Sequence, residues 1–195
     1  MAIDLNWKYI VAIVLQAGVI VYFVMQARKN KAAKAKSPVA DKYLDLRNLA
    51  ISITPQQLKL EIPSTHILVY GIVMDWDMGE DIVTLCAYIN GAANMYFRSG
   101  DAIIGGGKNK LVGEAAVDFV IMARDLIDRA IPTNTTDLPS PGCVRFHFLT
   151  NQKIYAAQEN INFITNGTSP WIKLFESGNL VMTAMRDMRN SGENK

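Results

Sequence analysis

The stretch IVTLCAYINGAANMYFRS, residues 82–99, decides the fold of this chain. Residues 82–89 are almost all apolar or β-branched, which predicts a buried strand. Asn90-Gly91 is the dipeptide that best fits a tight hairpin turn, and residues 93–99 then predict the returning strand. Residues 66–75, HILVYGIVMD, have the same character and predict a central strand. The three segments together indicate an antiparallel meander.

Helical and extended patterns alternate after the meander. Residues 108–130 repeat apolar side chains at helical spacing and predict a long amphipathic helix that Pro132 ends. Residues 144–150 and 154–159 predict a second hairpin. Residues 169–188 predict a final helix, because Ser and Pro at its start are a good N-cap and first helical residue.

Before the meander, residues 41–50 predict a short helix, and Thr54, followed by Pro and two Gln, predicts a brief helical turn. Strands grouped in hairpins and separated by helices are typical of an α+β domain, not of a doubly wound sheet. We therefore expect one α+β domain over residues 41–190, with a roughly five-stranded, mostly antiparallel sheet packed by helices. Residues 191–195 are expected to be a flexible tail.

An unbroken apolar run precedes the domain: YIVAIVLQAGVIVYFVM, residues 9–25. Its length is near the ~20 residues that a helix needs to cross a bilayer. A cleaved signal peptide would have a hydrophobic region of only ~7–15 residues with positive charge in front of it. Here Lys8 is the one basic residue before the run. We expect an uncleaved transmembrane helix at residues 9–27.

A basic cluster follows this run and sets the expected orientation. It consists of Arg28, Lys29, Lys31, Lys34 and Lys36. Because Lys and Arg near a span stay on the cytoplasmic side, the leader at residues 1–8 is expected outside, and the linker at residues 28–40 and the domain inside. The cluster is also expected to lie against anionic headgroups, which makes the bilayer a partner. The expected location is the inner cell membrane, in a single pass.

The chain after the anchor is slightly acidic. Residues 1–36 hold six of the 20 Lys and Arg and one of the 18 Asp and Glu, so residues 37–195 carry a net charge of −3. The absence of an evident basic face argues against nucleic-acid binding. Cys86 and Cys143 lie in apolar runs and are interpreted as buried strand thiols, and the sequence has no CxxC pair or metal-ligand spacing.

A glycine loop, GDAIIGGGK at residues 100–108, leads directly into the long predicted helix. The phosphate-loop pattern would need Gly in place of Ala102 and a hydroxyl in place of Asn109, so ATP hydrolysis of that type is excluded. Two interpretations remain: a tight, close-packed turn, or a surface that binds a phosphate-bearing ligand or a partner. The anion-binding candidates are Gly105, Gly106, Gly107, Lys108 and Lys110.

An acidic cluster, DWDMGED at residues 75–81, is interpreted as a solvated turn. Asp75 and Asp77 are weak metal candidates, with Asp101 as a third, but the EF-hand spacing fails and we expect no metal or cofactor. The partner-contact candidates are Trp76, Met182 and Met185, although core packing is equally consistent for the methionines. His66 and His147 are interpreted as structural, since no catalytic triad spacing surrounds them.

The sequence thus supports two functional hypotheses. The first is a membrane-tethered, noncatalytic cytoplasmic module that interacts with, or acts as a scaffold for, a protein partner or itself. The alternative is a ligand-binding or phosphoester-handling domain centred on the loop at residues 105–108. Ligands that bind the folded state must raise its thermal stability, which separates the two hypotheses experimentally.

Overall fold

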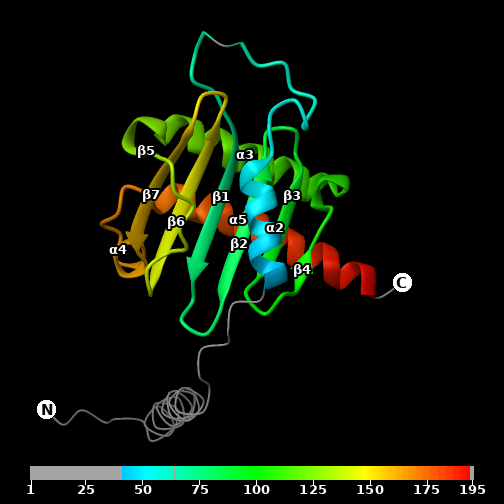
Figure 1. Cartoon of the computed structure of the whole chain (residues 1–195). Coiled ribbons are helices and arrows are strands. Elements are labelled where there is room, and N and C mark those ends of the chain that lie inside the picture. The colour runs from blue at the N-terminus through cyan, green and yellow to red at the C-terminus, as the bar shows by residue number, and fades with distance from the viewer. Residues whose placement is uncertain (1–40, 64, 194–195) are drawn as a thin grey trace, which may run out of the picture. The chain divides into compact units, whose positions relative to one another are not determined.

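A computed structural model of the chain describes residues 41–63 and 65–193 (Figure 1). These residues form an α+β fold in which helices cover both faces of one seven-stranded antiparallel sheet. The expected α+β class is confirmed, and the sheet has more strands than the sequence predicted. The expected leader, transmembrane helix and basic linker lie outside the described residues.

The sheet has the strand order β4-β3-β2-β1-β6-β7-β5, and every neighbouring pair is antiparallel. The strands are β1 (Val69–Asp77), β2 (Ile82–Tyr88), β3 (Ala93–Phe97), β4 (Ala102–Ile103), β5 (Ile131–Thr133), β6 (Cys143–Thr150) and β7 (Ile154–Asn160). The predicted central strand is β1, which pairs with β2 on one side and β6 on the other. The two strands that the sequence did not predict, β4 and β5, are short and form the edges.

The hairpin between β2 and β3 is wider than a two-residue turn. Its loop covers residues 89–92, and Tyr88 N–H donates to the Ala92 carbonyl at 2.9 Å. Gly91 has a φ of 82°, a left-handed value that favours glycine. The dipeptide was thus a correct signal for a turn, but the loop is longer than a type I′ turn.

The helices are α2 (Asp41–Ser52), α3 (Lys110–Leu126), α4 (Ile161–Thr165) and α5 (Ile172–Glu193), with 3₁₀ turns η1 (Gly106–Lys108) and η2 (Ile127–Arg129). The helix predicted at residues 108–130 is divided because Asn109, with φ −92° and ψ 124°, is extended. Ser169 Oγ accepts the Trp171 N–H at 3.1 Å, as expected of an N-cap residue. Helix α5 continues beyond residue 188 into the predicted tail.

The predicted turn at Thr54 has capping hydrogen bonds but no helix behind it. Thr54 N–H donates to Gln57 Oε1 at 2.8 Å, and Gln57 N–H donates to Thr54 Oγ1 at 3.4 Å. Lys59 then takes a φ of 58°. A non-glycine residue in this left-handed region ends the turn.

Two separate cores lie on the two faces of the sheet, which explains why β1 and β2 are buried along almost their whole length. Helices α3 and α5 cover one face, where Phe119, Phe146 and Leu174 are fully buried. Helix α2 covers the other face, where Tyr43 packs with Tyr88 and other residues of a smaller cluster. Figure 1 shows α2 in front of the sheet and α3 and α5 behind it.

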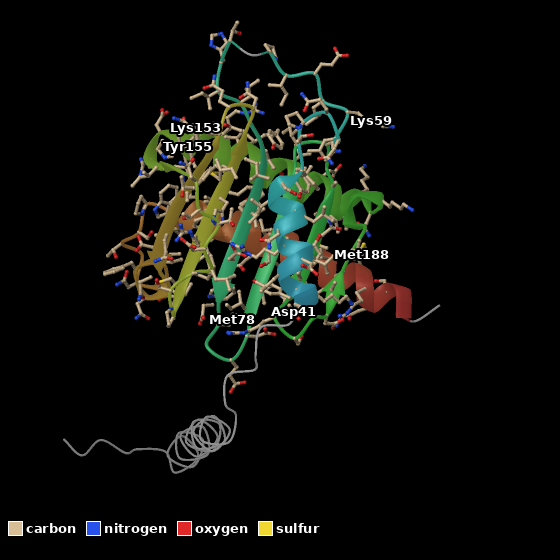
Figure 2. All side chains as sticks on the ribbon, viewed as in Figure 1. Asp41, Lys59, Met78, Lys153, Tyr155 and Met188 are labelled. Carbon is tan, nitrogen blue, oxygen red and sulfur yellow. The ribbon has the colours of Figure 1, made fainter. Side chains whose placement is uncertain are left out.

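Helix α2 begins at the same end of the domain as the turn between β1 and β2. In Figure 2, Asp41 and Met78 lie together at this end. Lys153 and Tyr155 lie at the opposite end, where the Lys153 ammonium is 5.4 Å from the Tyr155 ring centroid. The described chain therefore enters the fold beside the β1–β2 turn.

A glycine in α5 marks the closest approach of this helix to the sheet. A Cβ atom on Gly178 would lie 2.9 Å from Met74 Sδ and 3.1 Å from Phe119 Cζ. We expect Gly178→Ala to lower the free energy of unfolding by about 1–3 kcal/mol through overpacking, as measured by urea denaturation. Gly192→Ala is the matched control, because no atom lies within 4 Å of its added Cβ. Equal stability of the two variants would contradict this packing.

Candidate functional site

The glycine loop forms a tight connection between β4 and α3. Gly105 has a φ of 83°, and residues 106–108 form η1 before Lys110 begins α3. A Cβ on Gly106 would lie 2.7 Å from Val112 Cγ1, and one on Gly107 would lie 3.0 Å from the Gly91 carbonyl oxygen. Glycine is thus favoured at residue 105 by the backbone conformation and at residues 106 and 107 by the lack of space for a Cβ atom. This supports the interpretation of the loop as a close-packed turn.

The N-terminus of α3 is capped by its own chain. Asn109 Oδ1 accepts the N–H groups of Leu111 and Val112 at 3.0 and 3.3 Å. These are donors that a bound anion would otherwise use. The Lys110 ammonium lies 3.8 Å from Glu114 Oε1, and both side chains are largely exposed. The expected anion-binding residues are thus together in space, with part of their donor set already occupied.

A shallow groove of about 580 Å³ lies beside this loop, between the β2–β3 turn and α3. Its lining includes Gly91, Gly107 and Gly113, along with Lys108, Lys110, Glu114 and Asp118. Gly113 is unlike the loop glycines, because a Cβ there would make only ordinary contacts, at 3.7 Å or more. Glycine inside a helix costs roughly 0.5–1 kcal/mol relative to alanine. Close packing of a Cβ therefore does not account for Gly113, which lines the groove.

The acidic turn does not gather its carboxylates at the surface. Asp75 is fully buried on β1, and Asp77 Oδ1 accepts the Gly79 and Gly142 N–H groups at 2.9 and 3.4 Å. Asp101 lies elsewhere, 3.6 Å from the Arg189 guanidinium. Within residues 41–63 and 65–193, no group of three or more His, Cys, Asp or Glu side chains is arranged to hold a metal ion.

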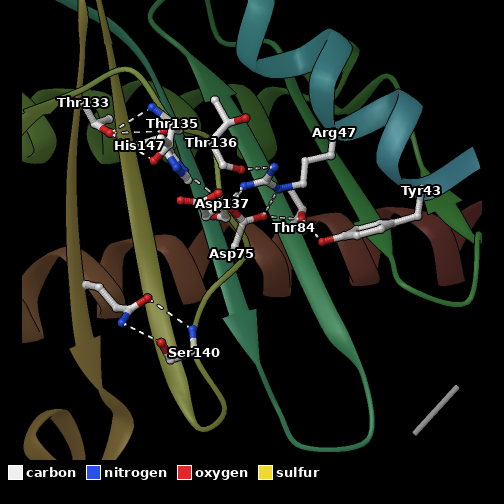
Figure 3. Close-up of polar contacts among 11 residues, drawn as sticks. Tyr43, Arg47, Asp75, Thr84, Thr133, Thr135, Thr136, Asp137, Ser140 and His147 are labelled. Atoms are coloured by element: carbon white, nitrogen blue, oxygen red, sulfur yellow. Dashed lines mark hydrogen bonds and ion pairs between the residues drawn. The ribbon is translucent and has the colours of Figure 1, made fainter. Parts of the chain in front are cut away.

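Asp75 is the centre of a buried polar cluster beneath α2 (Figure 3). Arg47, from α2, donates to both of its oxygens: Nε to Oδ1 at 3.0 Å and Nη2 to Oδ2 at 2.7 Å. Thr84 Oγ1 donates to Oδ1 at 2.5 Å. Because the Thr84 proton points at Asp75, the Tyr43 hydroxyl donates to Thr84, at 2.8 Å. One carboxylate thus joins α2 to the β1–β2 hairpin.

Arg47 also holds the segment at residues 134–142, which we call the strap. Its guanidinium donates to the Thr136 carbonyl at 2.7 Å and to the Asp137 carbonyl at 3.2 Å. His147 Nδ1 lies 3.5 Å from Asp75 Oδ2, and in the described structure neither ring nitrogen has a hydrogen-bond partner. The side chains of Arg47, Asp75 and His147 are at most 2% exposed.

The electrostatics of the cluster favour an ionised carboxylate. Burial alone raises the pKa of Asp75, but the contacts with His147 and Arg47 outweigh burial and lower the pKa to about 2. Burial raises the pKa of Tyr43 above its ordinary value, so its hydroxyl remains protonated and can donate. The cluster is closed to solvent and saturates the Asp75 oxygens, which fits a structural ion pair.

The predicted partner-contact residues are not on an open surface. Met182 and Met185 are 6% and 0% exposed and belong to the core under α5, so the structure does not offer them as contacts. Trp76 is half-buried and stands edge-on to Phe175, with ring centroids 5.0 Å apart. The membrane-surface candidates at residues 28–36 lie outside the described residues. Among the helices that are described, none is both long enough and apolar enough to cross a membrane.

No family model, curated protein or solved structure matches this chain.

The sequence analysis did not predict the Arg47–Asp75 ion pair or the position of Gly113 in the lining of the groove. A signal for the first was present: Tyr43, Arg47 and Ala50 repeat at helical spacing, so the arginine lies in the apolar stripe of its helix. The signal for Gly113 was a glycine inside a strongly periodic helix.

Removal of the Asp75 charge tests the ion pair. We expect Asp75→Asn to lower the free energy of unfolding by about 3–5 kcal/mol, because Arg47 remains buried without a counter-charge. Asp101→Asn is the matched control, since its carboxylate is 68% exposed in a surface pair, and it is expected to change stability by less than about 1 kcal/mol. Similar values in urea denaturation would show that the buried pair is not critical for stability.

The pH dependence follows from the lowered pKa. The folded value of about 2 lies below the ordinary 3.8, so the stabilisation is complete above about pH 5 and is lost as the pH falls toward 2. A shift of this size corresponds to roughly 2–3 kcal/mol. We expect the stability difference between wild type and Asp75→Asn to shrink by this amount between pH 6 and about pH 2, measured by urea denaturation. A constant difference would contradict the assignment.

Proposed function

We propose that this protein is a membrane-tethered, noncatalytic interaction or scaffold module whose folded domain faces the cytoplasm. The observation that supports an interaction role is the groove at Gly91, Gly107 and Gly113. These three residues have no side chains, so they contribute only backbone atoms to its lining. The helix-interior Gly113 has room for a Cβ atom and lacks one. A groove kept open at a cost in helix stability is suited to receive part of another molecule.

Two further observations support a binding role. The groups best suited to chemistry, Asp75, His147 and Thr84, are fully buried, and Asp75 and Thr84 are hydrogen-bonded within the cluster. Ile104 and Leu111 flank the loop at residues 105–108 in the sequence and are 62% and 70% exposed. Exposed apolar side chains of this kind can serve as contacts for a protein partner.

The alternative, a ligand-binding or phosphoester-handling domain, uses the same loop. Lys108 and Lys110 line the groove and favour an anion. Against this, Asn109 already caps the helix, and Glu114 and Asp118 bring negative charge to the same groove. The partner-binding proposal is therefore the better supported of the two.

The tether proposal depends on the apolar run at residues 9–25 and the basic residues after it. We expect the full chain to sediment with membranes and to resist alkaline extraction, and residues 37–195 expressed alone to remain in the supernatant. Added protease should reach the domain only from the cytoplasmic side. Recovery of the full chain in the soluble fraction would contradict the tether.

The groove is tested by site-specific photo-cross-linking in membranes that contain the full chain. We expect a cross-linker at Asn90, in the groove wall, to give a discrete adduct, and one at Met78, at the other end of β2, to give none. Gly113→Leu should fill the groove and reduce the Asn90 adduct by about tenfold or more, equivalent to about 1.4 kcal/mol of binding. The melting temperature should be retained.

The matched variant Gly113→Ala is expected to raise stability by about 0.5–1 kcal/mol. Identical adducts from Asn90 and Met78, or none from Asn90, would contradict the proposed surface. A rise in melting temperature with phosphate or nucleotide that Lys108→Gln removes would favour the alternative function instead.

A further inference from the structure

Helix α2 is attached to the rest of the fold by few apolar contacts. Four of its 12 residues are buried: Tyr43, Arg47, Ala50 and Ile51. Two of these four contribute their polar ends to the Asp75 cluster, and Leu49 is 60% exposed. A buried ion pair contributes little net stability, because desolvation offsets the attraction. Leu44 and Leu46 add partly buried contacts to the same cluster, so α2 is held by a short apolar face together with polar contacts that water can replace on opening.

The connection from α2 to β1 permits such an opening. Residues 53–68 separate the two elements, and the described part of this segment contains turns but no helix or strand. Leu58, Leu60 and Ile62 of this segment pack partly buried against the smaller core, whereas the pairing of β1 with β2 and β6 uses none of its residues. The sheet keeps its second core on the opposite face, where α3 and α5 pack.

The same arginine that holds α2 also holds the strap. Arg47 donates to Asp75 and, at the same time, to the carbonyls of Thr136 and Asp137. Figure 3 shows the guanidinium between the strap and Asp75. If α2 moves away, the strap loses both of these hydrogen bonds. The two covers of this face are thus coupled through one side chain.

We infer that α2 is a detachable cover of the sheet, that the Arg47–Asp75 pair is its latch, and that α2 and the strap are released together. Opening exposes a tyrosine-rich face formed by Tyr70, Tyr88 and Tyr96 of β1, β2 and β3. This device is independent of the groove beside α3, which lies outside the latch residues.

The reactivity of the two cysteines can follow the opening of α2 and of the strap separately. Cys86 is fully buried in the same cluster as Tyr43 of α2. Cys143 follows the strap, and its thiol donates to the Pro141 carbonyl at 3.8 Å. Cys86 and Cys143 are 0% and 9% exposed, so a thiol reagent reaches them mainly when their covers open, and burial also raises the pKa of both thiols and slows their reaction in the closed state.

The test is the rate of thiol labelling in the full chain at increasing urea. Single-cysteine forms, made with Cys143→Ser or Cys86→Ser, isolate each signal. In wild type, we expect Cys86 to react through a local opening whose rate does not depend on urea below the unfolding transition. Arg47→Met is expected to speed labelling of both thiols by about tenfold or more without urea.

Leu174→Ala is the matched control, because it removes a fully buried side chain on the opposite face. It is expected to destabilise the whole fold without raising labelling at low urea. If Arg47→Met does not fold, Arg47→Lys and the urea dependence of wild type provide the same test. The inference is overturned if Cys86 labelling follows global unfolding in wild type, or if the Arg47 variants expose Cys86 and leave Cys143 protected.

Discussion

The Asp75 carboxylate, buried in the central strand, is the constraint on which the arrangement of this domain depends. An ionised group in that position must be paired and hydrogen-bonded, since an unpaired buried charge is very costly. Arg47 supplies the pairing and thereby fixes α2 over this face of the sheet. Thr84 and Tyr43 extend the hydrogen-bond network, and the strap carbonyls accept two further guanidinium N–H groups.

The opposite face is organised by packing. Alternate residues of β1, β2 and β6 point toward α3 and α5, and the glycines at the contacts set how closely the backbones approach. Gly178 brings α5 onto Met74, and Gly107 brings the loop before α3 onto the β2–β3 turn. The position of α2 on one face is thus set by a polar cluster, and the positions of α3 and α5 on the other face are set by side-chain packing. The open groove lies where the second face meets its loops.

The strongly periodic segments could be predicted from the sequence. The three strands of the meander, the second hairpin and the long helix are confirmed to within a few residues, because burial imposes a clear period on each. Strands β4 and β5 and helix α4 were missed, since two to five residues carry no measurable period and depend on their neighbours. The placement of α2 could not be predicted either. Hydrophobic pattern does not reveal that Arg47 and Asp75, far apart in sequence, form a pair.

The sequence analysis pointed to the region of the groove but to only part of its lining. The loop at residues 105–108 does lie beside a groove, but Gly105 is explained by its left-handed backbone and Gly106 and Gly107 by close contacts, whereas Gly113 inside the helix has no close contact. Met182 and Met185 illustrate the limit of composition: the same helical spacing suits a surface and a core, and their burial decides for the core. The helical spacing of Trp171, Leu174, Phe175, Val181, Met185 and Met188 did predict the apolar face of α5, and this face packs into the core.

A double-mutant cycle between Arg47→Met and Asp75→Asn tests the central claim most directly, with the free energy of unfolding measured for the wild type, both single variants and the double variant. If the pair fixes α2 as described, each single variant leaves a buried partner unsatisfied, and the double variant recovers part of the loss. The coupling energy should then be about 2 kcal/mol or more. Additive effects, with a coupling below about 0.5 kcal/mol, would show that the two side chains act independently and would contradict this account.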